Sequence, residues 1–462
     1  MSSAPRLEAL TRARDLLTAV DADELTDRER LDAIAALEEI KAAAAAAQVR
    51  LAEAFDTSAR CAHIRSGGNP AKASRSIGSQ LALTLRTSPH RGDAFRSMST
   101  ALVDEMPHTL DALSRGVITE HHAAVAVRAT SGLPAGVREQ VDAAVAVDLG
   151  SLSPRRLDAA CRRLAAEIDA AAVVEKIART ARSRRVTVRP APDGMAYLSV
   201  LGPLPEVVGA YASLKRGAEA VVAGVDESET ADGRGVGAIM ADQALRLLSR
   251  REVGQGQPVL VNLVMTDRAL LGGGDLARST EEPASLPGRG PVPASLARPW
   301  VMDPATPARI RRLFTGPDGR DLTAMESRSR RFTGALAEMI RLRDQTCATP
   351  WCDAPIRDLD HVHQHSQGGA TSFANGAGLC ERCNDVKEQP GWAVTVTSDG
   401  TQGSGERRRT LWSTPTGQVH ATSPPPILGP GWRPLPDPDT TAYRVDVHWS
   451  CDLDVRVDLH AA

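Results

Sequence analysis

Four cysteines in two closely spaced pairs constrain this chain more than any other feature. The pairs are Cys347-x4-Cys352 and Cys380-x2-Cys383, and residues 353–379 connect them. Thiolates favour Zn²⁺, and each short spacing lets one turn present two sulfur atoms together. We therefore expect the four cysteines to bind one structural zinc ion, which stabilises a segment too small to form a good hydrophobic core.

The composition predicts a globular protein. At 462 residues and 42% hydrophobic content, the chain is long enough for about three domains. Its first residues lack the apolar core of a signal peptide, and no apolar run approaches the ~20 residues that a membrane span needs. We expect a cytoplasmic protein without a membrane partner, and the sequence does not predict its oligomeric state. Three further cysteines (Cys61, Cys161 and Cys451) are interpreted as small buried hydrophobic residues.

The charge distribution gives no global attraction to nucleic acid, because the net charge is −2. A local basic segment does exist in residues 308–344, which are rich in arginine and directly precede the cysteine pairs. Such a segment is suited to phosphate contacts. A solvated helix face would have the same composition, and both interpretations stay open.

The apolar periodicity predicts an α+β protein with a mainly helical N-terminal region and a small α+β middle region. The expected divisions are a helical domain (1–183), an α+β part (184–271), a linker with the arginine-rich segment (272–340), the cysteine-containing module (341–395), and C-terminal strands with a proline-rich tail (396–462). Within the linker, residues 288–293 are also compatible with an ordered turn.

Local signals predict the individual elements. Thr26-x-x-Glu29 is a capping box that opens a long helix ending near Phe55. Further elements are expected as helices at 81–88, 95–104, 109–115, 119–128, 136–149, 154–182, 205–222 and 239–251, as a hairpin at 186–200, and as strands at 259–265, 394–397, 409–413 and 443–459.

A second set of polar residues lies between and after the cysteine pairs, and a structural zinc does not need it. The order is Asp360-His361, Gly368-Gly369, Asn375, and Cys383-Asn384-x2-Lys387. This pattern resembles an HNH endonuclease, the ββα-metal nuclease module, in its cysteine-rich zinc-stapled form. The helical and α+β region upstream, including Met106–Leu110, Gly116–Thr119 and Gly290–Pro293 with Ala297-Arg298, is similar to the domain of unknown function 222, which commonly precedes such a module.

The resemblance implies a role for each matched residue. His361 would be the general base, since a histidine with a pKa near 6.5 can deprotonate water near neutral pH. Asn375 would orient His361. Asp360 and Asn384 would bind Mg²⁺ or another divalent cation through oxygen. DNA is the implied partner, and Lys387, Arg341 and Arg343 are the candidate nucleic-acid contacts.

Two features depart from the simplest match. The third motif position is Asn384 rather than histidine, although asparagine keeps an oxygen ligand. His363 and His365 follow His361 at alternating positions and would share its face on a continuous strand, so they compete for the role of the base. Lys387 is compatible with a phosphate contact or with a solvated helix surface. A non-catalytic zinc-stapled nucleic-acid-binding module and a protein-interaction scaffold are the alternative functions.

Overall fold

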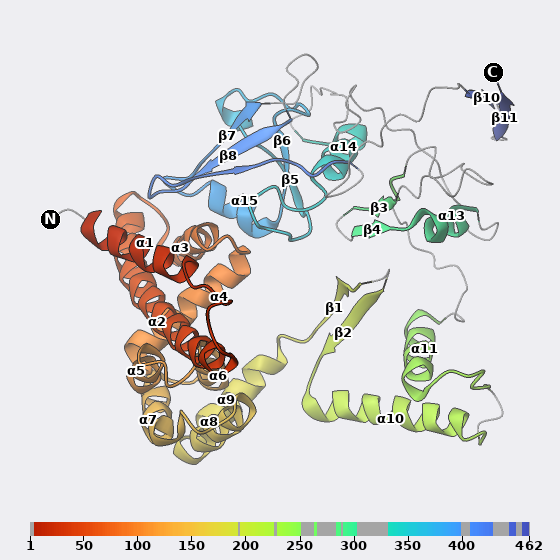
Figure 1. Cartoon of the computed structure of the whole chain (residues 1–462). Helices are drawn as coiled ribbons and strands as arrows, with labels where there is room; N and C mark the ends of the chain where they lie inside the picture. Colours follow the sequence, from red (N-terminus) through yellow and green to blue (C-terminus); the bar gives the residue numbers. More distant parts are fainter. Residues whose placement is uncertain are drawn as a thin grey trace.

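The computed structural model describes ten stretches of the chain, which include the helical region from residue 4 onwards and the cysteine-containing module (Figure 1). The described residues are 4–192, 195–225, 229–250, 263–265, 283–287, 290–302, 331–398, 407–427, 443–449 and 455–461. The expected α+β fold class is confirmed: helices fill the N-terminal part, and the rest combines small antiparallel sheets with further helices.

In the described part of the N-terminal domain, residues 4–183, there are nine α-helices. They are α1 (Ala4–Thr18), α2 (Asp27–Arg65), α3 (Pro70–Thr84), α4 (Pro89–Thr100), α5 (Pro107–Ser114), α6 (Glu120–Thr130), α7 (Ala135–Val145), α8 (Pro154–Ile168) and α9 (Ala170–Ala181). The capping box at Thr26 is confirmed: the Thr26 backbone N–H donates to Glu29 Oε2 at 2.8 Å, and Thr26 Oγ1 accepts from the Glu29 N–H.

Several boundaries differ from the predicted ones. The long helix continues to Arg65, α1 was not predicted, and the segment expected as one helix at 154–182 is two helices that meet at Asp169. The Asp169 carboxylate accepts a hydrogen bond from the Ala172 N–H at 2.9 Å, so it caps the start of α9. A cap of this kind is not visible in the apolar periodicity, which continues through the break.

The core of the helical domain is built on small side chains of α2. Ala42, Ala45, Ala46 and Val49 are buried at helical spacing and pack with Leu113 and other apolar residues of the later helices. Small residues let helices approach closely, so one long helix can serve as the central support of the bundle.

Asp142 on α7 is a buried carboxylate that holds the first turn of α5. Its two oxygen atoms accept hydrogen bonds from the backbone N–H groups of His108 and Thr109 at 2.8 and 3.0 Å, and Thr109 Oγ1 donates a third. The first N–H groups of a helix have no partner within the helix. Asp142 therefore satisfies donors that would otherwise be buried without an acceptor.

The middle region is a hairpin followed by two helices. Strands β1 (Arg185–Pro190) and β2 (Ala196–Leu201) pair antiparallel, as predicted, with Val186 opposite Val200. Helices α10 (Leu204–Val222) and α11 (Val236–Ser249) follow and contact each other through Ala218, Val221 and Ile239. Both strands of the hairpin are exposed along their whole length.

Part of the predicted linker is ordered. Strands β3 (Ala284–Leu286) and β4 (Gly290–Val292) form a short hairpin, and α13 (Ala294–Met302) follows. Residue Val264 bridges to Ser285, and the rest of the strand expected at 259–265 lies outside the described residues, apart from 263 and 265. Most of the arginine-rich segment also lies outside them, at 303–330.

The cysteine-containing module has the expected ββα order. Strand β5 (Asp358–His361) pairs antiparallel with β6 (Gly376–Leu379), and α15 (Glu381–Lys387) follows directly. Helix α14 (Gly334–Asp344) packs on this unit through Leu336, Ile340 and Phe373. The predicted start of the module at residue 341 therefore falls inside a helix.

The predicted end of the module at residue 395 falls inside a strand. Strand β7 (Ala393–Ser398) spans that boundary and forms one sheet with β8 (Arg409–Ser413) and β9 (Val419–Thr422), of which β9 was not predicted. Trp412 on β8 is buried in the same cluster as the cysteines. The single strand expected at 443–459 is a hairpin of β10 (Tyr443–Trp449) and β11 (Val455–Ala461).

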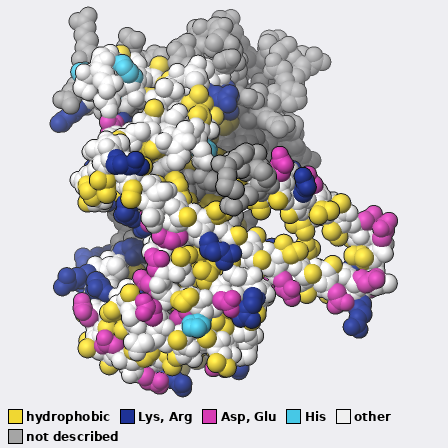
Figure 2. Space-filling model, turned by 90° about the vertical axis from the view of Figure 1, so that its left-hand side faces the viewer, with side chains coloured by type: hydrophobic (Ala, Val, Ile, Leu, Met, Phe, Trp, Pro, Cys, Tyr) yellow, Lys and Arg dark blue, Asp and Glu magenta, His cyan; other side chains and the backbone are white. Residues whose placement is uncertain are grey.

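The described surface carries mixed charge, and the described helices do not have the character of membrane spans. On the face shown in Figure 2, basic and acidic side chains are interspersed, in keeping with the net charge of −2. Among the described residues, no helix combines the length and the apolar character needed to cross a bilayer, including the 39-residue α2.

Replacing Asp142 with asparagine is expected to lower the free energy of unfolding by about 1–3 kcal/mol, because the new amide N–H₂ would face a buried backbone donor. Urea denaturation followed by circular dichroism at 222 nm measures the change. Asp148→Asn, at an exposed position six residues away, is the control. Equal stability of the two variants would contradict the assigned role of Asp142.

Candidate functional site

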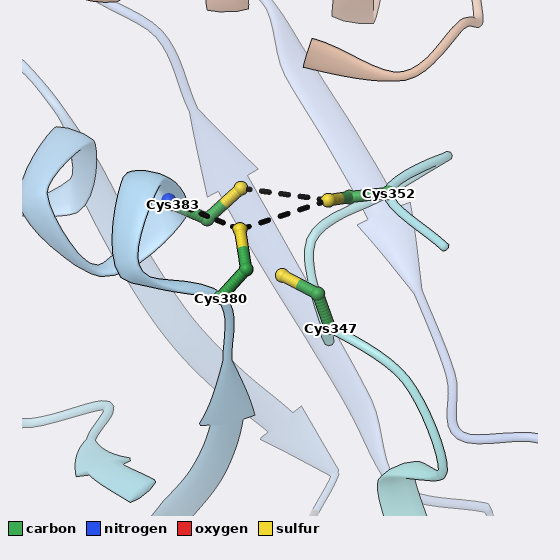
Figure 3. Close-up of side chains that lie close together, drawn as sticks. All are labelled: Cys347, Cys352, Cys380 and Cys383. Carbon is green, nitrogen blue, oxygen red and sulfur yellow. Dashed lines mark hydrogen bonds between the residues drawn. The ribbon is translucent and has the colours of Figure 1, made fainter. Parts of the chain in front are cut away.

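Four sulfur atoms converge at the base of the ββα unit (Figure 3). Cys347 and Cys352 come from the loop after α14, while Cys380 is the N-cap of α15 and Cys383 lies in its first turn. All four sulfur atoms lie within 4.8 Å of one another, and the Cys352 Sγ atom is 3.9 Å from Cys380 Sγ and 3.7 Å from Cys383 Sγ.

These distances fit a tetrahedral zinc site. Four sulfur ligands about 2.3 Å from a zinc ion lie about 3.8 Å from one another. Hydrogen bonding among the sulfur atoms, with Cys347 as the first partner, holds the pKa of Cys380 well below its usual range and raises the pKa of Cys383. Four close thiolates repel one another, and a divalent cation at their centre removes that repulsion. The predicted cysteine cluster is therefore assembled in the fold and is suited to zinc.

Buried hydrophobic residues surround the cluster. Leu379, Val386, Trp392 and Trp412 pack with the cysteines, and Leu83 of the helical domain joins them. The remaining predictions for cysteine are mixed: Cys161 is buried, as expected, whereas Cys61 is exposed and that prediction is wrong. Cys451 lies outside the described residues.

His361 ends strand β5 and is almost fully buried, with 7% of its surface exposed. Its Nε2 atom lies 2.9 Å from Thr371 Oγ1, and its Nδ1 atom lies 3.9 Å from Asp360 Oδ1. The ring of Phe332 is 4.6 Å from the His361 ring, between centroids. The imidazole is therefore held in one orientation with Nδ1 on the side of Asp360.

Sequence reasoning missed Thr371 and Phe332. Thr371 lies two residues after the Gly368-Gly369 pair. Its closeness to that pair in the sequence was the only signal that could have pointed to a contact with His361. Gly369 itself leaves no room for a side chain, because a Cβ atom there would overlap the His363 carbonyl group. The glycine thus lets the loop return closely enough for Thr371 to meet His361.

The two competing histidines do not share the position of His361. Strand β5 stops at His361, so the expected alternation on a continuous strand is wrong. His363 and His365 are both exposed, and His365 lies in a short 3₁₀-helix (His365–Gln367) with its ring 5.4 Å from that of His361, between centroids.

Asn375 fastens the loop that follows His361. Its Oδ1 atom accepts from the His363 N–H at 2.8 Å, and its Nδ2 atom donates to the carbonyl groups of His363 and Ala370 at 2.9 and 2.8 Å. In addition, the Asn375 carbonyl accepts from the Val362 N–H. Asn375 contacts the backbone on both sides of the loop rather than the His361 ring.

Asn384 and Lys387 lie on the face of α15 that meets β5. The Lys387 Nζ atom is 2.8 Å from Asp360 Oδ2, and the Lys387 side chain is only 5% exposed. It also pairs with Glu388. Lys387 is therefore neither a solvated surface lysine nor directed away from the site.

The Asn384 side chain carries an oxygen atom without a protein partner. Its Nδ2 atom contacts Asp358 Oδ2 at 3.4 Å, while Oδ1 is buried and accepts no hydrogen bond. A buried carbonyl oxygen without a donor is unusual, and a hard cation is one of the few groups that can satisfy it. The oxygen chemistry of Asp360 and Asn384 fits Mg²⁺ or a similar divalent ion.

Arg343 does not fit its expected role in nucleic-acid binding. Its side chain is 5% exposed and pairs with Asp344 at 2.6 Å, and it donates to the carbonyl groups of Phe373 and Gly376 at 2.6 and 2.7 Å. Because its donors serve the interior of the module, we remove it from the candidate contacts. Arg341 on the same helix is exposed.

The fold and site define a protein with a helical N-terminal region and a four-cysteine ββα module, and the comparisons with known proteins agree. Residues 31–344 match the domain of unknown function DUF222, and residues 345–389 match the HNH endonuclease domain. The chain belongs to the DUF222 family and carries an HNH domain of the nuclease class directly after it.

Three curated relatives come from Mycobacterium tuberculosis. The uncharacterized proteins MT2160 (strain CDC 1551 / Oshkosh) and Rv2100 (strain ATCC 25618 / H37Rv) are each 32% identical over 178 residues, which is 36% of this chain and 29% of each relative. The uncharacterized protein Rv3776 of the second strain is 28% identical over 202 residues, or 39% of this chain and 35% of the relative. The chain thus spans about a third or less of their lengths. No solved structure matches it.

Replacing Cys352 with serine is expected to lower the bound zinc from one ion per chain towards zero and to lower the melting temperature of the C-terminal module, since the remaining three thiolates hold the ion less well. Elemental analysis and differential scanning calorimetry measure the two changes. Cys161→Ser, outside the cluster, is the matched control for zinc content. Unchanged zinc content in Cys352→Ser would contradict the metal-site assignment.

Proposed function

We propose that this protein is a metal-dependent DNA endonuclease that hydrolyses phosphodiester bonds with His361 as the general base. The observation that carries the proposal is the meeting of Asp360-His361 on β5 with Asn384 and Lys387 on α15, inside a segment that matches the HNH endonuclease domain. Together these residues supply a base, two oxygen ligands for a metal ion and a positively charged lysine side chain at one place.

His361 acts by removing a proton from the attacking water. When Nε2 carries the proton and donates it to Thr371 Oγ1, the Nδ1 atom is the basic nitrogen, and it lies on the side of Asp360. A base that is held in one orientation loses little entropy when it takes the proton. Asn375 contributes by fixing the backbone of the loop that leaves His361.

Asp360 and Asn384 would hold the divalent cation, which supplies charge stabilisation for the phosphate and the leaving 3′ oxygen when it is bound. Lys387, which contacts Asp360, adds a positive charge beside the same phosphate. Arg341 is exposed on α14 and is available to contact the DNA backbone outside this site.

The purified zinc-loaded chain is expected to convert supercoiled plasmid DNA to nicked or linear forms in Mg²⁺, Mn²⁺ or Ni²⁺. The His361→Ala variant is expected to cleave at least about a hundredfold more slowly, because a general base usually contributes at least that much to the rate. His363→Ala is the matched control, because it removes an exposed histidine two residues away. Equal rates for the wild type and His361→Ala would contradict the assigned base.

Replacing Asp360 with alanine is expected to abolish cleavage and to weaken Mg²⁺ or Mn²⁺ binding while the bound zinc stays at one ion per chain, since only the oxygen site loses a ligand. Isothermal titration with Mn²⁺ and elemental analysis separate the two sites. Wild-type cleavage by Asp360→Ala would remove this residue from the site. Inactivity of the wild type with every divalent ion would favour a non-catalytic binding module or a scaffold.

A further inference from the structure

Helix α15 presents different faces to three neighbours, and one of these faces is not explained by the nuclease site. Cys383 points into the sulfur cluster, while Asn384 and Lys387 face β5. Arg382 and Asp385, three residues apart, point to the helical domain instead. Residues three apart share one side of a helix, so this is a continuous contact face. Figure 1 shows α15 beside α3.

Arg382 occupies a socket formed by polar groups of α3 and α4. Its guanidinium pairs with the Asp93 carboxylate, with Nη2 at 3.0 Å from Oδ1, and Nη2 also donates to the Arg75 carbonyl at 3.0 Å and to Ser79 Oγ at 3.3 Å. Its side chain is 21% exposed. An arginine with partners on two helices is held by geometry as well as by charge.

Two glycines make the socket possible. A Cβ atom on Gly78 of α3 would overlap the Asp93 carboxylate, and one on Gly92 of α4 would overlap the Gly78 carbonyl group. The two helices therefore approach more closely than larger residues allow, and the approach places Asp93 at the position that Arg382 reaches.

Further contacts surround the socket. Lys72 and Arg75 of α3 both pair with the Asp385 carboxylate, and Arg75 Nη1 lies 3.6 Å from Asp385 Oδ2. The Trp392 indole N–H donates to Ser76 Oγ at 2.9 Å, within a buried environment. Apolar contact adds to these polar ones, since Leu83 is buried in the cluster that holds the cysteines.

Arg382 lies between two cysteines of the cluster, Cys380 and Cys383, with only Glu381 beside it in that interval. The backbone conformation that brings the two sulfur atoms to one centre is thus the conformation that aims Arg382 at Asp93. We propose that the helical domain docks on α15 through Arg382 and that this docking is thermodynamically coupled to zinc binding by the four cysteines.

The coupling is reciprocal. If docking raises the affinity for zinc, zinc raises the strength of docking by the same factor. The helical part of the DUF222 region then acts as a support for the nuclease module, and Arg382 is a positioning residue. The inference rests on the zinc assignment and is independent of whether the site cuts DNA.

The test places the change in the helical domain, far from the cysteines in the sequence. The Asp93→Ala variant removes the partner of Arg382. The control is Asp158→Ala, which removes a carboxylate that pairs with Arg162 in the same domain. The two aspartate side chains are similarly exposed, 33% for Asp93 and 32% for Asp158. Zinc affinity of the full chain is measured by competition with a chelator of known affinity. We expect Asp93→Ala to weaken zinc binding about fivefold or more, and Asp158→Ala to leave it unchanged within about twofold.

Equal zinc affinity for the wild type and both variants overturns the proposal. A second measurement uses the wild type alone: zinc removal is expected to speed amide hydrogen exchange in α3 while α6 exchanges as before. Unchanged exchange in α3 also overturns the coupling. A chain that binds no zinc overturns both this inference and the metal assignment, whereas loss of nuclease activity alone bears only on the proposed function.

Discussion

The structure depends on the convergence of four sulfur atoms at the start of α15. This helix has only seven residues, too few to be stable alone, and its position is fixed by Cys380 and Cys383 at its first turn. From that fixed point the same helix directs Asn384 and Lys387 to the strand that carries Asp360. The cysteine cluster therefore orients side chains that it does not itself touch.

The second constraint is the close support of β5 and its following loop. Thr371 and Phe332 hold the His361 ring, and Asn375 holds the loop backbone. The interior is completed by charged groups used as structural parts: Arg343 and Arg408 both donate to the Gly376 carbonyl, at 2.7 and 3.0 Å. These two arginines therefore stabilise the interior of the module from segments that precede and follow its strands.

Much of the candidate site could be predicted from the sequence because its residues are joined by short, regular spacings. Each of these patterns lies within one short segment: the two cysteine pairs in a loop and at a helix start, Asp360-His361 on one strand, and the Cys383-Asn384-x2-Lys387 run on one helix. Contacts between distant segments left no such trace: nothing near Arg382 points to Asp93, and nothing near Arg343 shows that it is buried. The fold followed the same rule. The capping box at Thr26 and the hairpin at 186–200 were local, whereas the extent of the sheet with Trp412 depended on packing with the cysteines.

A crystal structure of the full chain with Mn²⁺ tests the assignment of the two metal sites most directly, because anomalous scattering distinguishes manganese from zinc. We expect zinc at the centre of the four cysteines and manganese within coordination distance, about 2.2 Å, of an Asp360 carboxylate oxygen and of Asn384 Oδ1. Manganese bound elsewhere, or a zinc-free cysteine cluster with Lys387 still on Asp360, would contradict the claim that one helix serves both metals.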